Sequence, residues 1–171
     1  GTAGTGGFAN YAASVGYFDS VYIDAVITVF MILFGVNFNL YFFLLMREFK
    51  PVWKNEELKA YIGIILMSAL MITINISHLY TGPLKAFRYA VFQVASVITT
   101  TGYATADFVE WPMFSQNILL FLMMVGACAS STGGGMKVAR FLMMLKCIKR
   151  EIVEMVHPKA VRIIRMNGKK M

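Results

Sequence analysis

The stretch Ser-Val-Ile-Thr-Thr-Thr-Gly-Tyr, residues 96–103, decides the fold that the sequence predicts. Small hydroxyl residues end there in a glycine and an aromatic residue, between two hydrophobic segments. Glycine adopts backbone conformations that other residues avoid, so this composition favours a chain that leaves helical geometry. In a membrane, irregular backbone is tolerated only where it is buried in protein or lines a cavity. Its carbonyl groups would then be available to hold a cation in place of water.

The chain of 171 residues is strongly hydrophobic, and its charges are unevenly distributed. Hydrophobic residues make up 58% and charged residues 15%, and the mean hydropathy is +0.63. Three stretches, residues 25–46, 60–84 and 111–136, contain no Lys, Arg, Asp or Glu. About 20 apolar residues suffice to cross a bilayer as a helix. The composition therefore predicts an integral membrane protein.

The apolar stretches predict transmembrane helices over 21–46 and 60–79 and a third, broken helix over 112–150. The connector 47–59 is rich in Lys and Arg, and residues 137–171 carry ten Lys and Arg against two Glu. Basic segments beside membrane helices lie mostly on the cytoplasmic side. Nucleic-acid binding is the alternative for such a basic tail, but a cytoplasmic tail is favoured and no nucleic-acid partner is expected.

Residues 83–98 have helical character but are too few to cross a membrane. At 1.5 Å per residue they reach only about 24 Å. Pro83 suits the first turn of a helix, and the segment runs directly into Thr-Thr-Thr-Gly-Tyr at 99–103. We expect a re-entrant pore helix whose carbonyl end favours a cation, followed by an extended loop. An ordinary short membrane helix with a glycine-rich turn is the alternative.

The chain repeats this loop. Residues 5–8, Thr-Gly-Gly-Phe, align with residues 100–103, Thr-Thr-Gly-Tyr, and Phe-Met-Ile-Leu-Phe-Gly at 30–35 matches Phe-Leu-Met-Met-Val-Gly at 121–126. Each loop precedes an acidic stretch and an apolar segment. Two copies in the same direction predict an all-α membrane protein built from tandem helix–pore loop–helix repeats around an ion pathway. The alternative, an ion-coupled secondary transporter with broken helices around a midplane site, predicts inverted repeats instead.

A second irregular segment interrupts the third apolar stretch. Residues 126–135 contain four glycines, and each costs about 1 kcal/mol relative to alanine in a helix interior. We therefore expect a break in the helix over 112–150. Within the membrane, such a segment must be buried in protein or lie in the aqueous path.

Catalytic and nucleotide-binding motifs are not found. A phosphate-binding loop is excluded because Met136 separates the glycines from Lys137 and Val138 follows. No Ser-His-Asp set, HExxH motif or carboxylate pair is recognisable, so an enzyme is not expected. Cys128 and Cys147 form no CxxC motif and imply neither a metal site nor a disulfide framework.

Together these motifs resemble the Trk/Ktr/HKT superfamily of potassium-uptake proteins, and its bacterial Trk branch in particular. The matching segments are Thr-Gly-Gly-Phe at 5–8, Val-Gly-Tyr-Phe-Asp-Ser at 15–20, Phe-Gly-Val-Asn-Phe at 34–38, Phe-Gln-Val-Ala-Ser at 92–96, residues 99–108, Ser-Thr-Gly-Gly-Gly-Met-Lys at 131–137 and His-Pro-Lys-Ala-Val at 157–161. As a set they are specific, and they cover nearly the whole chain.

The resemblance implies four segments. Residues 1–46 would be the filter loop and second helix of one pore repeat, 47–59 a cytoplasmic connector, 60–150 a complete repeat, and 151–171 a basic cytoplasmic linker toward the next repeat. In the complete repeat, the outer helix would be 60–79, the pore helix 83–98, the filter 99–103 and the broken inner helix 112–150.

The resemblance also implies a function and partners. Potassium would cross the bacterial inner membrane through a pore of four repeats, with two such chains paired and a cytoplasmic nucleotide-binding regulatory subunit docked below. Potassium is the transported substrate, and no cofactor is expected. Because two of the four filter loops are missing, we expect the chain to be a piece of a longer polypeptide that does not conduct alone.

The resemblance finally implies two sets of site residues. Filter carbonyls would come from Thr5, Gly6, Gly7, Thr100, Thr101 and Gly102. A movable gate loop below the filter would contain Gly126, Ser130, Ser131, Thr132, Gly133, Gly134 and Gly135, with Lys137 near its cytoplasmic end.

Overall fold

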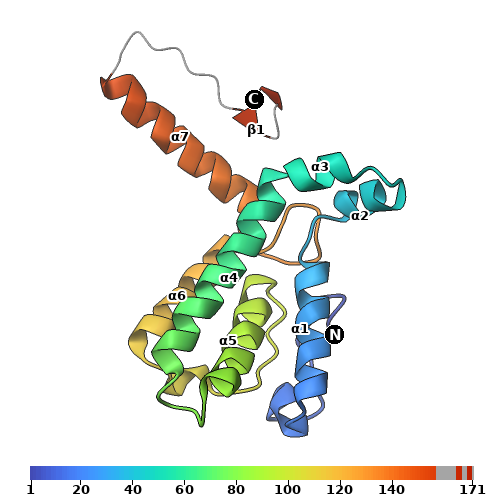
Figure 1. The fold of residues 1–171 in the computed structure, drawn as a ribbon, viewed down its shortest axis with the longest axis vertical. Helices are drawn as coiled ribbons and strands as arrows, with labels where there is room; N and C mark the ends of the chain where they lie inside the picture. The colour runs from blue at the N-terminus through green and yellow to red at the C-terminus, as the bar shows by residue number, and fades with distance from the viewer. Residues whose placement is uncertain (157–164, 167–168, 171) are drawn as a thin grey trace.

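The structure is a computed structural model that describes residues 1–156, 165–166 and 169–170. Helices dominate this part of the chain (Figure 1). The α-helices are α1 (Val21–Phe34), α2 (Phe38–Leu45), α3 (Phe49–Lys54), α4 (Glu56–Ile76), α5 (Pro83–Ile98), α6 (Met113–Val125) and α7 (Val138–Val156), and the 3-10 helices are η1 (Ser14–Phe18) and η2 (Phe108–Glu110). Two short strands, β1 (Arg165–Met166) and β2 (Lys169–Lys170), pair antiparallel. Apart from this pair, the expected all-helical fold is confirmed.

Helix α5 is the centre of the packing and lies between α4 and α1 (Figure 1). It has the bounds that the sequence predicts, because Pro83 opens its first turn and Gly82 precedes it with a φ of +120°. Residues four apart share one helix face. On α5 this face is buried against α4 and α6 and consists of Ala86, Ala90, Val94 and Ile98.

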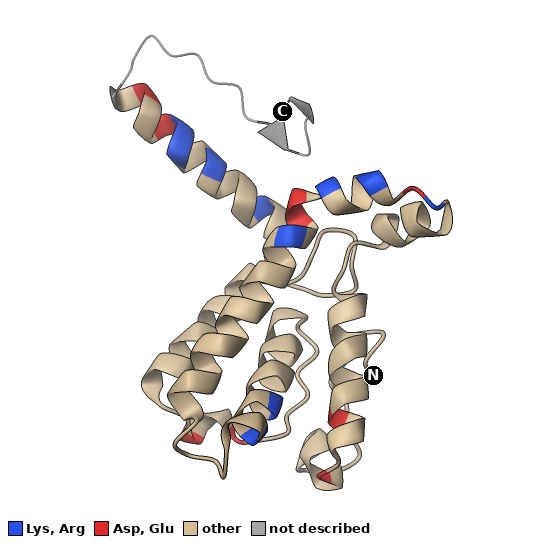
Figure 2. Cartoon of the chain, viewed as in Figure 1, with Lys and Arg blue, Asp and Glu red and all other residues tan. Residues whose placement is uncertain are grey.

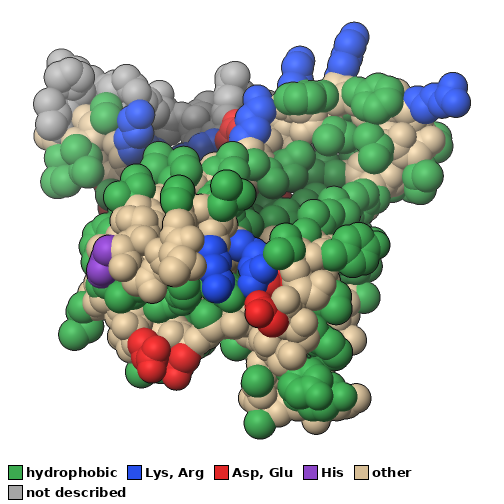
Figure 3. Space-filling model, turned by 60° about the horizontal axis from the view of Figure 1, so that its bottom comes forward, with side chains coloured by type: hydrophobic (Ala, Val, Ile, Leu, Met, Phe, Trp, Pro, Cys, Tyr) green, Lys and Arg blue, Asp and Glu red, His purple; other side chains and the backbone are tan. Residues whose placement is uncertain are grey.

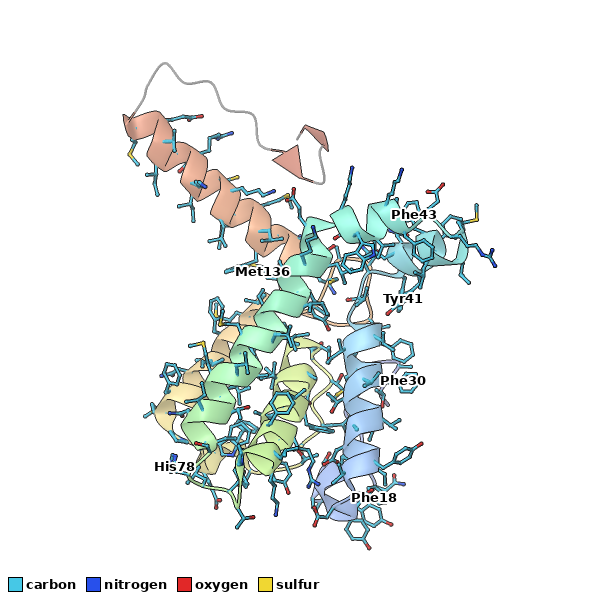
Figure 4. All side chains as sticks on the ribbon, in the orientation of Figure 1. Phe18, Phe30, Tyr41, Phe43, His78 and Met136 are labelled. Carbon is cyan, nitrogen blue, oxygen red and sulfur yellow. The ribbon has the colours of Figure 1, made fainter. Side chains whose placement is uncertain are left out.

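A second face of α5 is buried against α1. Phe92 and Ala95 of α5 form a smaller cluster with Met31 of α1, Val15 of η1 and Tyr103 of the loop after α5. Helix α5 is thus enclosed on two sides, and its C-terminal end is held firmly by both neighbours. The far side of α1 is open: Phe30 is 47% exposed and points away from α5 (Figure 4).

The prediction of one continuous helix over 21–46 is wrong. Helix α1 ends at Phe34, and α2 leaves it at an angle of 91°. Asn37 causes the new start, because its side-chain oxygen accepts the Asn39 N–H at 2.9 Å and caps α2. Gly35 allows the close packing of this break, since a Cβ there would collide with the Tyr61 hydroxyl.

The predicted connector is also more ordered than a loop. Helix α3 occupies residues 49–54, and α4 already begins at Glu56 because Asn55 caps it by accepting the Leu58 N–H at 2.8 Å. The basic linker predicted over 151–171 begins inside α7. Residues 157–164, 167–168 and 171 of that linker, with the His-Pro-Lys-Ala-Val motif, lie outside the described residues.

Charged residues gather at two ends of the molecule and leave an uncharged band between them (Figure 2). Among the described residues, one helix, Glu56–Ile76, is long and apolar enough to cross a membrane by itself, and the bent pair of α1 and α2 could make a second span. Helix α6 is apolar but shorter. Hydrophobic side chains cover much of the surface between the charged groups (Figure 3).

Candidate functional site

The loop after α5 folds back over the last turn of its own helix. The carbonyl of Ser96 accepts hydrogen bonds from the N–H groups of Thr101 at 2.9 Å and Gly102 at 3.3 Å. The Ser96 hydroxyl donates to the carbonyl of Tyr103 at 2.6 Å. Carbonyls at a helix end have no partner within the helix, so these contacts satisfy one of them and fix the loop against α5.

The side chains of this loop turn into the protein. Thr99 and Thr101 are buried, with their hydroxyls 2.8 Å apart. The Thr99 hydroxyl donates to the Ala95 carbonyl at 2.7 Å. The side chains of Thr99 and Thr101 are thus used for interior contacts, which leaves the backbone carbonyls of this loop without these hydroxyls as competing groups.

The two predicted filter loops share one backbone pattern. Thr5 and Thr100 have φ values of +47° and +56°, and Gly7 and Gly102 have values of +64° and +83°. The residue between each pair does not have a positive φ. Four positions in the left-handed region, two of them threonine, are uncommon in L-residue chains. The agreement at aligned positions supports the equivalence that the sequence repeat predicts.

The loops also lie against each other. A Cβ on Gly7 would collide with the carbonyl of Thr101, so only glycine permits this approach. Further out, the Gly16 N–H donates to the Ala104 carbonyl at 3.1 Å, and the Ala104 N–H donates to the Ser14 hydroxyl at 3.3 Å. Residues almost a hundred positions apart in the chain therefore form one continuous surface.

Six carbonyl groups on this surface accept no hydrogen bond from any residue that the structure describes. They are those of Thr5, Gly6, Gly7, Thr100, Thr101 and Gly102. Backbone groups at membrane depth need a partner, which must then be water, another protein segment or an ion. A cluster of carbonyls without protein donors can replace the hydration shell of a cation.

The predicted gate residues all lie in the loop that joins α6 to α7. The two ends of this loop meet at Gly126 and Gly135, which form its neck. Gly126 and Gly135 touch through their backbones, since a Cβ on Gly126 would lie 2.9 Å from the Gly135 Cα. Gly126 adopts a φ of 72° and a ψ of −166°, a region that is essentially restricted to glycine. Beyond the neck, Met136 leads into α7 (Figure 4).

One limb of the loop is fastened to the helices. The Cys128 N–H donates to the Gly35 carbonyl at 3.0 Å, and the Ser130 carbonyl accepts the Phe38 N–H at 3.1 Å. Between these two bonds, the Ala129 N–H donates to the Glu57 carboxylate at 2.5 Å. Residues 128–130 are thus held by the α1–α2 break and by the first turn of α4.

The other limb contacts both filter loops. The Thr5 hydroxyl donates to the Thr132 carbonyl at 3.1 Å, and the Gly134 N–H donates to the Thr100 hydroxyl at 2.6 Å. Gly133 fits tightly, since a Cβ there would lie 2.6 Å from the Ala127 Cβ. The structure therefore joins the predicted filter and gate residues in one hydrogen-bonded unit.

Lys137 forms its hydrogen bond within the loop and not with the surrounding helices. Its ammonium donates to the Gly133 carbonyl, and its φ is 75°. Within the described part of the chain Lys137 has no ion pair with a carboxylate. It therefore closes the loop internally by binding a carbonyl that would otherwise be free.

Two charged side chains, Arg88 and Glu57, lie outside the sequence motifs. Arg88 of α5 lies 3.0 Å from Asp19 and 3.3 Å from Asp24 of α1, and Asp24 is buried. Basic side chains next to acidic ones are visible at this end of the molecule (Figure 3). Glu57 is the second group. The available signal was a charged residue at the edge of an apolar helix, which does not distinguish a buried carboxylate from a solvated one.

Apolar helices around paired loops with unpaired carbonyls are features of membrane proteins that transport ions. The sequence profile of the TrkH family, described as a cation transport protein, matches residues 2–171. The chain belongs to the TrkH family, whose members are transporters and not enzymes. Its location is accordingly the bacterial inner membrane, in a multi-pass protein.

Named relatives agree with this family. The chain is 40% identical to "Trk system potassium uptake protein TrkH" of Vibrio parahaemolyticus and 39% identical to that of Salmonella typhimurium, over 98% of this chain in both cases. It covers 36% and 35% of those two proteins. The crystal structure of the potassium transporter TrkH from Vibrio parahaemolyticus superposes with a TM-score of 0.93 at 39% identity, over 99% of this chain and 37% of that one.

Proposed function

We propose that the chain forms part of a potassium-uptake pore, with residues 5–7 and 100–102 supplying carbonyls to its selectivity filter. Further repeats of the same polypeptide would complete the ring. Potassium is the proposed cation because the relatives that the chain matches are named potassium uptake proteins. Movement would follow the electrochemical gradient, since the repeated loops run in one direction and not as the inverted pair of a carrier.

The observation that carries this proposal is the set of six carbonyls without a donor among the described residues. A filter must strip water from the ion and replace it with oxygens of suitable number and spacing. The side chains of Thr99 and Thr101 are buried, and the hydroxyls of Thr5 and Thr100 are bonded to the loop of residues 126–137. The ion would therefore meet backbone carbonyl oxygens of the paired loops.

The loop of residues 126–137, between α6 and α7, is the proposed gate. It lies on the predicted cytoplasmic side of both filter loops and is bonded to each of them through Thr5 and Thr100. A gate needs two backbone arrangements that differ by only a few kcal/mol. Its four glycines give the backbone the freedom that a second arrangement needs, and the bonds to the filter loops and the helices would stabilise the closed one.

We further propose that two copies of the complete protein pair and that a cytoplasmic nucleotide-binding subunit regulates them. The name "Trk system" of the relatives supports a multi-component assembly. Basic residues gather around α3 and α7 (Figure 2), and this end of the chain would face such a subunit.

The test of the proposed function is rubidium uptake by the complete transporter in proteoliposomes. Rubidium is a close substitute for potassium, so uptake should occur, saturate, and be competed by potassium far better than by sodium. It should persist after proton and sodium gradients are collapsed by ionophores. Uptake that stops when both gradients are removed would favour the secondary transporter and contradict a pore.

A further inference from the structure

Glu57 is a buried carboxylate at the cytoplasmic end of the predicted pore. It is 4% exposed, although it lies in the first turn of α4 close to solvent. Within the described residues it has no ion-pair partner. Burial of an unpaired charge is costly unless hydrogen bonds compensate it. The burial of Glu57 therefore needs an interaction inside the protein that compensates its cost.

Helix capping does not supply that interaction. Asn55 is the N-cap of α4 and already accepts the Leu58 N–H. A carboxylate near a helix N-terminus is favourable, but it gains this benefit equally when it is solvated. Glu56, the neighbouring residue, illustrates the difference: it is partly exposed and forms an ion pair with Lys146 of α7.

The contact that Glu57 makes inside the protein is with the loop of residues 126–137. Its Oε1 accepts the Ala129 N–H at 2.5 Å. This bond lies between the two backbone bonds from Cys128 and Ser130 to the α1–α2 break. Among the bonds that the structure describes between residues 128–130 and the helices, it is the one that a helix side chain supplies. Hydrogen bonds to an ionised acceptor are about twice as strong as neutral ones.

We propose that Glu57 is a positioning residue that clamps the loop of residues 126–137 in its closed arrangement. The inference rests on the proposed gate function of that loop. Opening would require the Ala129 N–H to leave the carboxylate, so the reach of the Glu57 side chain helps set the fraction of open pores. Neither the sequence motifs nor the family match assigns a role to this residue.

The test compares two conservative variants of the complete transporter. Glu57→Gln keeps an acceptor oxygen at the same reach and removes the charge. Glu57→Asp keeps the charge and withdraws the oxygen by one methylene. Glu48→Gln, an exposed acidic residue at the predicted cytoplasmic end, is the matched control for lost charge. Basal rubidium flux and hydrogen–deuterium exchange of peptides covering residues 126–137 are measured for each.

A clamp predicts that Glu57→Asp is the more damaging change. Its basal flux and its exchange in the loop should both rise about tenfold, as expected when a charge-assisted hydrogen bond is lost. Glu57→Gln should change them by only about twofold to threefold, because a neutral acceptor remains. Glu48→Gln should match wild type. A role through charge alone predicts the reverse order of the two variants.

The two measurements test the proposed clamp role of Glu57 and the proposed gate role of the loop separately. Unchanged exchange in residues 126–137 for both Glu57 variants would overturn the clamp, whatever the flux. Faster exchange confined to this loop, with wild-type flux and regulation, would establish the contact but refute the gate and with it the role proposed for Glu57. Exchange can be read even if a variant transports nothing.

Discussion

At the scale of single residues, the glycines of the two filter loops are required for different reasons. Gly7 is held where any side chain would strike the Thr101 carbonyl. Gly102 has no atom within 4 Å of an added Cβ, so its requirement comes from its φ of +83° alone. A side chain at Gly7 would push the loops apart, whereas one at Gly102 would enter open space beside the carbonyls.

The first prediction concerns Gly102→Ser in the complete transporter. A left-handed conformation costs a non-glycine residue about 1 kcal/mol, and the new side chain would lie beside the proposed ion path. We expect lower rubidium uptake or higher sodium uptake than wild type, measured as a flux ratio. Gly4→Ser is the control, because Gly4 has open space and no positive φ. An unchanged ratio and rate would remove Gly102 from the filter.

The second prediction concerns Gly126, at the neck of the glycine-rich loop. A methyl group there would lie 2.5 Å from the Gly134 carbonyl oxygen, on backbone that alanine avoids. Gly126→Ala should lower the free energy of unfolding by about 1–3 kcal/mol. Gly63→Ala, in the interior of α4 with nothing within 4 Å, should instead raise it by about 0.5–1 kcal/mol. Denaturant unfolding in micelles compares them. Stabilisation by both variants would mean that residues 126–135 are only a flawed helix.

At the scale of elements, the loop of residues 126–137 unites parts of the chain that the sequence presents separately. One limb is bonded to the α1–α2 break and α4, and the other is bonded to the filter loops. The neck continues directly into α7, which is tied to α4 by the Lys146–Glu56 pair. A shift of α7 would therefore move the loop. The hydrogen bonds from Thr132 and Gly134 would pass this movement on to Thr5 and Thr100.

The third prediction follows from this arrangement. Deletion of residues 129–134 removes the bonds from the loop to Glu57, Phe38, Thr5 and Thr100 and leaves the Cys128–Gly35 bond. Basal flux should therefore rise and regulatory control should weaken. Replacing Gly133 and Gly134 together by alanine should slow gating, because the added methyl groups would crowd Ala127 and the Thr100 hydroxyl. Flux in proteoliposomes with and without the regulatory subunit measures both effects. A well-folded deletion variant with normal flux and normal regulation would exclude the gate.

Some helix boundaries can be predicted from the sequence, and others cannot. Helix α5 is predictable to the residue, because Gly82-Pro83 and the threonine run bound one amphipathic segment. The break after Phe34 is not predictable from hydropathy. The residues on both sides are equally apolar, and hydropathy carries no information about helix capping. The cause of the break is the Asn37 side chain, whose oxygen accepts the backbone N–H of Asn39 two residues further on. Asparagine within an apolar stretch, directly after Gly35-Val36, is the signal that could have indicated the break.

The candidate site is likewise predictable from the sequence only in part. Both loops and the glycine-rich segment are recognisable by composition, because glycine and threonine recur at aligned positions. The bonds between them, and the inward turn of Glu57, depend on long-range packing of α1, α4 and α5. No local pattern encodes such contacts between distant residues, and they are known only from the three-dimensional arrangement.

At the scale of the whole molecule, the charges define an axis. Basic residues lie around α3, the start of α4 and α7, and acidic residues with a few basic ones lie at the opposite end (Figure 2). Cytoplasmic loops carry an excess of Lys and Arg. We therefore predict that the filter loops and residues 104–110 lie toward the outside relative to the glycine-rich loop.

The fourth prediction tests that orientation with single cysteines at positions 54, 107 and 167. The background carries alanine at Cys128 and Cys147 and is first shown to transport normally. An impermeant thiol reagent applied to intact cells should label position 107 and leave positions 54 and 167 unlabelled until the membrane is opened. Labelling of position 167 but not 107 in intact cells would reverse the topology.

The central claim is that a cation is held by backbone carbonyls of both loops, and rubidium can be located directly. The complete transporter, crystallised with rubidium in place of potassium, should show an anomalous difference peak at the open side of residues 5–7 and 100–102, within coordination distance of their carbonyl oxygens. The peak should weaken in the Gly102→Ser protein. A transport-competent protein that binds rubidium elsewhere, with no peak between these loops, would contradict the account.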